Sequence, residues 1–222
     1  ILAIMRKEIR GYFGSALALI FVGAFLSATL FIFFWGEAFF SRNISDVRLL
    51  FKWMPVLMLF LVATLTMRQW SEEQRSGTME VLLTLPVRPI YLVIGKLLGV
   101  LALVSLALVV TLVLPVTVAL LGDLDWGPVV GGYVASLLMA GTYAAVGLFI
   151  SSRTDNQIVA LILTVISSAI LYGVGTATAT NFAGEHFAEI MRAFGTGSRF
   201  TSIERGVIDL RDLTYYGSLA IV

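Results

Sequence analysis

The longest apolar stretch of the chain occupies residues 90–121 and reads IYLVIGKLLGVLALVSLALVVTLVLPVTVALL. A helix needs about 20 apolar residues to cross a hydrocarbon layer about 30 Å thick. This stretch is longer than a straight crossing requires, so we expect Pro115 to kink it or one end to leave the membrane. The stretch therefore predicts a membrane-spanning helix.

Further apolar runs lie on both sides of this stretch, and each predicts another helix that crosses the membrane. They occupy residues 15–36, 53–68, 128–150, 158–178 and 213–222. The run at 53–68 is short, so it must recruit part of residues 49–51 or sit against its neighbours, and the run at 213–222 is cut short where the sequence stops. We therefore predict an all-α integral membrane protein with six transmembrane helices, which form one transmembrane domain over residues 1–222.

Composition supports this class and excludes others. Hydrophobic residues make up 59% of the chain and charged residues only 13%, whereas a soluble domain carries about 25% charged residues. The net charge of +1 gives no field that would attract nucleic acid. With no cysteine and one histidine, the chain lacks a disulfide framework, thiol chemistry and a histidine metal cluster, so we expect no metal site.

The first 14 residues differ from the spans that follow. Apolar residues recur at helical spacing, and Arg6, Lys7 and Arg10 lie between them. This pattern predicts an N-terminal interfacial helix over residues 1–14, with its bases toward anionic headgroups. The alternative is an ordinary extension of the first span. The basic cluster, together with a base in the turn at 151–157 and none in the turn at 122–127, favours an N-terminus inside the cell.

A long segment between the last two predicted spans, residues 180–212, mixes apolar and charged side chains. We expect short amphipathic helices, broken at Gly195 and Gly197, that rest on the outer leaflet or dip into it. A loop of this length without structure of its own would be unusual unless it is functional. Its candidate contacts for an outer partner are Phe200, Glu204, Arg205, Asp209, Arg211 and Asp212.

The segment between the second and third spans, residues 68–89, contains two short predicted helices. Ser71 followed by two glutamates resembles a helix start, and Gly77 and Thr78 offer a break and a new cap. Pro86 and Pro89 end the second of these helices. Its apolar residues would be exposed in a water-facing loop and suggest a docking surface; they are Met79, Leu82, Leu83 and Leu85.

The run E-x-x-x-G-T-M-E-x-L-L-x-x-P-V, which starts at Glu73, resembles the permease subunits of type-2 (ABC-2) ABC transporters. Residues 200–216 are similar to the gliding-motility (Gld-type) permeases within that family. The resemblance implies that residues 72–85 are a coupling helix held by a separate ATPase subunit; the alternative is a solvated amphipathic loop. The implied coupling residues are Glu72, Glu73, Arg75, Gly77, Thr78, Met79, Glu80, Leu82, Leu83 and Pro86.

The resemblance also implies a complex in the bacterial inner membrane, with two permeases, identical or different, and two ATPases. The chain has no G-x-x-x-x-G-K-[ST] motif, so we expect ATP and Mg²⁺ on the ATPase subunit and no catalytic residue or cofactor here. The middles of the spans lack ionisable residues, which argues against a self-powered transporter. Two alternatives to a permease are a non-transporting mechanotransmitter that acts on an envelope protein, and a stand-alone channel or carrier.

Overall fold

A computed structural model describes residues 1–14, 16–37, 46–84, 86–182, 191, 194–204 and 209–221, and the regular elements within them are helices. In chain order these elements are α1 (Leu2–Phe13), α2 (Ala16–Phe31), the π-helix η1 (Ile32–Gly36), α4 (Arg48–Thr66), α5 (Ser71–Arg75), α6 (Thr78–Thr84), α7 (Pro89–Thr111), α8 (Val113–Leu121), α9 (Trp126–Ser151), α10 (Gln157–Val174), α11 (Ala177–Phe182), α13 (Thr196–Glu204) and α14 (Leu210–Ile221).

Five helical stretches are long and apolar enough to cross a membrane. They are Ala18–Gly36, Arg48–Arg75, Pro89–Leu121, Trp126–Ser151 and Gln157–Val174. These stretches overlap the first five spans expected from the sequence. The sixth stays a prediction, because α14 has only 12 described residues.

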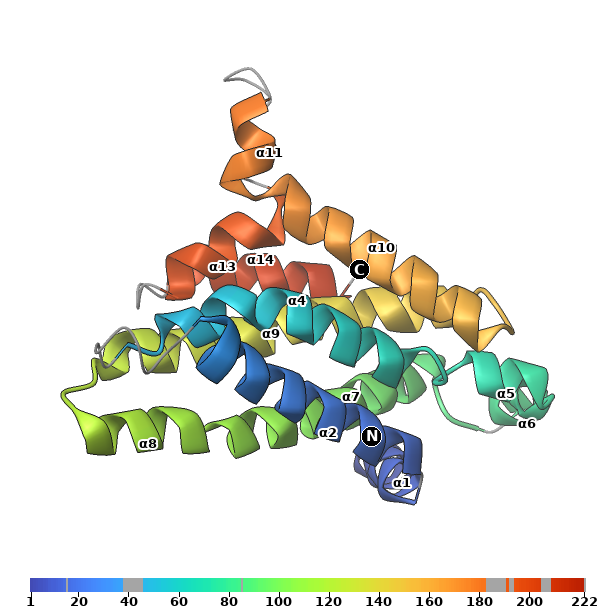
Figure 1. Cartoon of the computed structure of the whole chain (residues 1–222). Coiled ribbons are helices and arrows are strands. Elements are labelled where there is room, and N and C mark those ends of the chain that lie inside the picture. The colour runs from blue at the N-terminus through green and yellow to red at the C-terminus, as the bar shows by residue number, and fades with distance from the viewer. Residues whose placement is uncertain are drawn as a thin grey trace.

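The centre of the bundle is the pair α4 and α9, which run side by side through the middle of Figure 1. Both have 61% of their most apolar window buried. Glycines of α9 allow the close approach: a Cβ on Gly132 would lie 2.5 Å from the ring of Phe51. The remaining long helices pack around this pair, and α10 is the least covered, with 17% of its window buried.

The long apolar stretch at residues 90–121 forms two helices and not one. The first, α7, ends at Thr111, and α8 begins at Val113. Pro115 has no N–H to donate to the carbonyl of Thr111, so the hydrogen-bond ladder is interrupted one turn before the proline. Leu112 instead donates to the carbonyl of Val109 at 3.1 Å.

Two helix boundaries differ from those expected. The second long helix begins at Arg48, five residues before the predicted start, and it runs through Pro55. Arg48 and Lys52 interrupt the apolar run there, but the helix continues through them because both are paired: Lys52 Nζ is 2.9 Å from Glu37 Oε1, and Arg48 Nη2 is 3.9 Å from Asp125 Oδ2. The fifth long helix ends at Val174, not residue 178, where Gly175 packs against the backbone of Gly195.

In the described part of residues 180–212, which we call the outer segment, α13 and the start of α14 are built into the core, whereas α11 stands away from the bundle (Figure 1). Helices α13 and α14 pack against α9 (Figure 1). Phe200 is 1% exposed and Ile203 is fully buried, and Arg199 Nη1 lies 2.7 Å from Asp212 Oδ1. The expectation that Phe200 and Asp212 face an outer partner is therefore not met, because one side chain fills the core and the other is paired internally.

Candidate functional site

The short helices α5 and α6 project from one end of the bundle, between α4 and α7 (Figure 1). Two side chains tie α5 to the end of α9. Ser71 Oγ donates a hydrogen bond to the carbonyl of Ser151 at 3.2 Å, and Gln74 Nε2 donates to the carbonyl of Ser152 at 2.6 Å. Helix α5 is therefore fixed to a part of the chain that lies 80 residues away in sequence.

The break between α5 and α6 is made by Gly77, whose φ of +71° lies in the left-handed region that favours glycine. The hydroxyl of Thr78 donates to the carbonyl of Glu73 at 3.3 Å and lies 2.9 Å from the hydroxyl of Ser76. The sequence predicted a helix start at Thr78, and α6 does begin there. Its side chain, however, also satisfies a carbonyl at the end of α5.

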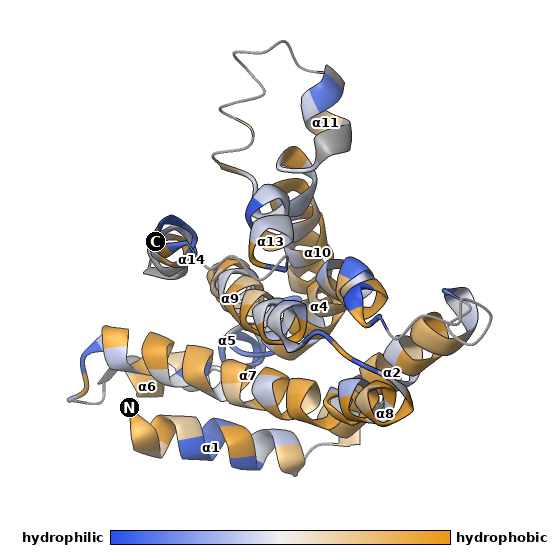
Figure 2. Cartoon of the chain, turned by 90° about the vertical axis from the view of Figure 1, so that its left-hand side faces the viewer, coloured by the Kyte–Doolittle hydropathy of each residue, from blue (hydrophilic) through white to orange (hydrophobic). Residues whose placement is uncertain are grey.

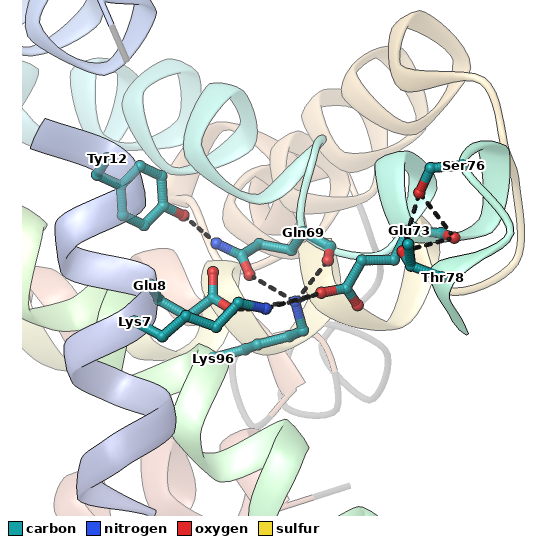
Figure 3. Close-up of polar contacts among 8 residues, drawn as sticks. All are labelled: Lys7, Glu8, Tyr12, Gln69, Glu73, Ser76, Thr78 and Lys96. Carbon is teal, nitrogen blue, oxygen red and sulfur yellow. Dashed lines mark hydrogen bonds and ion pairs between the residues drawn. The ribbon is translucent and has the colours of Figure 1, made fainter. Parts of the chain in front are cut away.

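The ammonium group of Lys96, about two turns into α7, is the centre of the polar contacts in this region (Figure 3). Its side chain is 2% exposed. Nζ donates to Glu73 Oε1 at 2.9 Å, to the carbonyl of Gln69 at 2.7 Å and to Glu8 Oε1 at 3.4 Å. It also lies 4.7 Å from the ring centroid of Trp70. A buried ammonium is tolerated only when it is paired in this way.

The same network reaches the N-terminal helix. Lys7 Nζ lies 3.5 Å from Glu73 Oε1 and 3.7 Å from Glu8 Oε1. Tyr12 accepts a hydrogen bond from Gln69 Nε2 and donates one to the carbonyl of Leu65 at 2.8 Å. Burial raises the pKa of the Tyr12 phenol above its usual value, so the hydroxyl remains a donor at neutral pH. Helices α1, α4, α5 and α7 therefore meet at one set of polar contacts.

Two glycines let α1 lie directly on α7, as Figure 2 shows from the side. A Cβ on Gly95 would lie 2.6 Å from Ile4 Cγ2, and a Cβ on Gly99 would lie 2.9 Å from Glu8 Cβ. The close approach brings Glu8 within reach of Lys96. The amphipathic character predicted for residues 1–14 is present, with Arg6, Lys7 and Arg10 exposed.

The solvent-exposed face of α5 and α6 carries both charged and apolar side chains. Among the expected coupling residues, those exposed are Glu72, Arg75, Gly77, Thr78, Glu80 and Pro86. Val81 is 64% exposed and was not singled out from the sequence. Glu73 is turned inward, with 14% of its side chain exposed. Among its described residues, the exposed part of α5 and α6 therefore combines charges with the apolar side chain of Val81.

The apolar cluster expected to be exposed on α6 is turned partly inward. Met79 and Leu82 are half-buried and pack against Trp70, Leu92 and Leu148. They cover a small core of their own, which a sequence cannot distinguish from a docking surface because both need an apolar helix face. Leu85 and the side chain of Leu83 lie outside the described residues, as does Arg205 of the outer segment.

Sequence reasoning gave no role to three members of the network, Glu8, Tyr12 and Gln69, and it noted Lys96 only as a position that matches the motif of ABC-2 permeases. One signal was present, since Lys96 lies between Gly95 and Gly99 in an otherwise apolar helix. Small residues beside a charge predict that this helix face is covered by another helix, and a covered ammonium requires a carboxylate. In the outer segment, Asp209 and Arg211 are exposed and Glu204 is half-buried.

One family matches the sequence, and its description is ABC-2 family transporter protein. The match covers residues 41–195, which is more than half of the chain and includes α4 to α11. No curated protein and no solved structure matches the chain. The five helices that are long and apolar enough to cross a membrane agree with a transporter membrane protein. The chain therefore belongs to the ABC-2 family of transporter membrane proteins.

Proposed function

We propose that this chain is the permease subunit of a bacterial ABC transporter, and that α5 and α6 receive ATP-driven motion from a separate ATPase subunit. The observation that carries the proposal is the position of these helices. They project beyond the long helices with one face exposed, while their other face is tied to α1, α7 and α9. A segment that a partner grips, and that is firmly joined to several spans, suits the transmission of force.

The exposed contacts proposed for the ATPase are Glu72, Arg75, Thr78, Glu80 and Val81. Val81 would enter an apolar pocket of the partner and the charges would surround it, since protein interfaces commonly have an apolar centre and a polar rim. Glu73 has a different role in this proposal. It contacts Lys96 and Lys7 inside the protein, so it is a positioning residue.

Motion of α5 would reach the spans along two routes. One leads through Ser71 and Gln74 to the end of α9, and α9 packs against α4, α7, α10, α13 and α14. The other leads through Glu73 and Lys96 to α7 and α1. Because packed helices have few alternative arrangements, a displacement at this end would shift whole helices rather than single side chains.

The proposal is tested by Glu80→Arg in the complex with the ATPase. Reversal of an exposed charge should leave the fold intact, and it should abolish most of the stimulation of ATPase activity by the permease. Asp209→Arg, also exposed but outside the proposed contact, is the matched control. Thr78→Cys should form crosslinks to the ATPase, and the chain has no other cysteine to confuse the result. Unchanged stimulation together with absent crosslinks would refute the coupling role.

We further propose that the chain lies in the inner membrane with its N-terminus on the cytoplasmic side, that two permeases work together, identical or different, and that the subfamily is the gliding-motility (Gld-type) one. The bases of α1 and the sequence of residues 200–216 support these points. A mechanotransmitter that acts on an envelope partner receives less support. Its proposed contacts include Phe200 and Asp212, which are buried.

A further inference from the structure

A cleft of about 350 Å³ opens beside the Lys96 network, between α1, α2, α4 and α5. The apolar part of its wall comes from α2 and the end of α4, with Ala18, Phe21 and Leu65. The charged part of the wall comes from the other lining segments and has six residues: Lys7, Glu8, Arg68, Glu72, Glu73 and Lys96. A wall that is partly apolar and partly charged suits an amphiphile.

The cleft lies where long helices end. Ala18 is the first residue of its candidate span, and Leu65 is in the last turn of α4. The stretch that contains Lys96, Pro89–Leu121, has 33 residues, and a helix of that length measures about 50 Å. Because a hydrocarbon layer is about 30 Å thick, part of this helix lies outside it. Lys96 lies near one end of this stretch, which is the end that the proposal below places among lipid headgroups.

The charges that line the cleft select the class of headgroup. Three cations face three carboxylates, so the wall has no net charge and gives no advantage to an anionic lipid. Lys96 is already surrounded by four acceptor atoms. Lys7 is different: its Nζ lies 3.5 Å from Glu73 Oε1 and 3.7 Å from Glu8 Oε1, but 64% of its side chain is exposed. Its ammonium can therefore also contact a phosphate, and a lipid ammonium would share the carboxylates with the cations that already pair with them.

We propose that the cleft binds the headgroup of a zwitterionic phospholipid with a primary amine, of the phosphatidylethanolamine class. Its phosphate contacts Lys7, its ammonium donates to the carboxylates, and its upper acyl chain lies on Phe21 and Leu65. A primary ammonium has hydrogens to donate, whereas a choline headgroup has none. The cleft volume is near the lower end of the range for ligand sites, which fits a headgroup and not a whole lipid.

Gly11 permits a direct test, because it lines the cleft and a Cβ placed on it meets no atom within 4 Å. Gly11→Leu should fill the cleft without strain. The matched control is Gly23→Leu, at an equally open glycine of α2 that does not line the cleft. Each protein is exchanged into nanodiscs with equal parts of phosphatidylethanolamine, phosphatidylcholine and phosphatidylglycerol, and the lipid retained after extraction is measured by native mass spectrometry.

The proposal expects wild type and Gly23→Leu to retain phosphatidylethanolamine, and Gly11→Leu to retain about tenfold less. Equal retention by the two variants would overturn it, and so would preferential retention of phosphatidylglycerol or phosphatidylcholine by the wild type. A photoactivatable phosphatidylethanolamine provides a second measurement. It should label peptides of α1 and α2 in the wild type, and labelling only elsewhere would contradict the site.

The phosphate contact is tested separately with two variants that remove the same charge from the same helix. Lys7→Gln should lower retention of phosphatidylethanolamine about tenfold, since it removes a charge-assisted hydrogen bond. Arg6→Gln, which does not line the cleft, should leave retention unchanged. Equal losses would show that general attraction by α1, not this cleft, holds the lipid. None of these measurements requires the ATPase, so their outcome is independent of the proposed coupling.

Discussion

Lys96 shows how one charge inside an apolar helix organises its surroundings. Lys96→Met would leave the carboxylates of Glu73 and Glu8 buried without that cation. Breaking a buried ion pair from one side costs about 3 kcal/mol or more, so we expect a clear drop in thermal stability in detergent. Arg48→Met is the control, because its pair with Asp125 is exposed and 3.9 Å long; it should cost less than about 1 kcal/mol.

The lost stability in Lys96→Met has a specific cause, which a second substitution can check. If uncompensated carboxylates are responsible, adding Glu73→Gln should recover part of the loss, because the remaining amide needs no cation. A double variant as unstable as the sum of the two single variants would indicate that Lys96 acts through packing alone.

Gly77 is a second residue whose backbone decides local structure. Gly77→Ala meets no neighbouring atom, but it places a side chain at φ +71°. The left-handed conformation costs a residue with a Cβ roughly 1–2 kcal/mol. We therefore expect faster hydrogen exchange in α6 and little change in α9. Gly23→Ala, at an open helical glycine, should leave both unaffected; faster exchange throughout the chain would contradict a local effect.

At the scale of the element, the contact between α4 and α9 depends on a missing side chain. A Cβ on Gly132 would lie 2.5 Å from Phe51 Cγ. Overpacking of this kind costs about 1–3 kcal/mol, and Gly132→Ala should lower the melting temperature accordingly. Gly141→Ala on the same helix is the control, since its Cβ would meet Leu101 at an ordinary 3.9 Å. Phe51→Leu should relieve part of the effect if the ring is the obstacle.

Hydropathy predicts helices well where apolar residues are continuous, and less well where they are not. The helices α7–α8 and α9 begin and end within about two residues of the expected limits, because uninterrupted apolar runs have only one stable form in lipid. The start of α4 was placed five residues late, since Arg48 and Lys52 make its first turns look like a loop, although the shortness of the run indicated that residues 49–51 could join it. Periodicity also identified the apolar face of α6, but not that its partners are Trp70, Leu92 and Leu148.

At the scale of the whole molecule, the hydrogen bonds from Ser71 and Gln74 to the end of α9 predict that residues 68–89 and the turn at 151–157 lie on the same side of the membrane. The chain contains no cysteine, so single cysteines report accessibility cleanly. Thr78→Cys and Asp155→Cys should react with a membrane-impermeant thiol reagent from one side, and Asp123→Cys from the other. If Thr78→Cys and Asp123→Cys react from the same side, the α7–α8 stretch does not span the membrane.

The candidate site was only partly predictable because its contacts join distant parts of the chain. Glu8 and Lys96 are 88 residues apart, and Gln69 and Tyr12 are 57 apart. A local sequence pattern identifies the exposed surface of α5 and α6, because that surface is formed by residues close together in the sequence. It cannot identify which of several carboxylates meets a lysine, because that choice depends on how whole helices pack.

The close contact of α1 with Gly95 and Gly99 of α7 has a practical consequence for variants that lack α1. Shortened versions that begin after residue 14 would uncover a bare strip of backbone and leave Lys96 open on one side. Detergent and water would then reach the ammonium group of Lys96, which is buried when α1 is present. Fluorescent or affinity fusions are therefore better attached without trimming these residues, because the first helix serves as a lid on the third span.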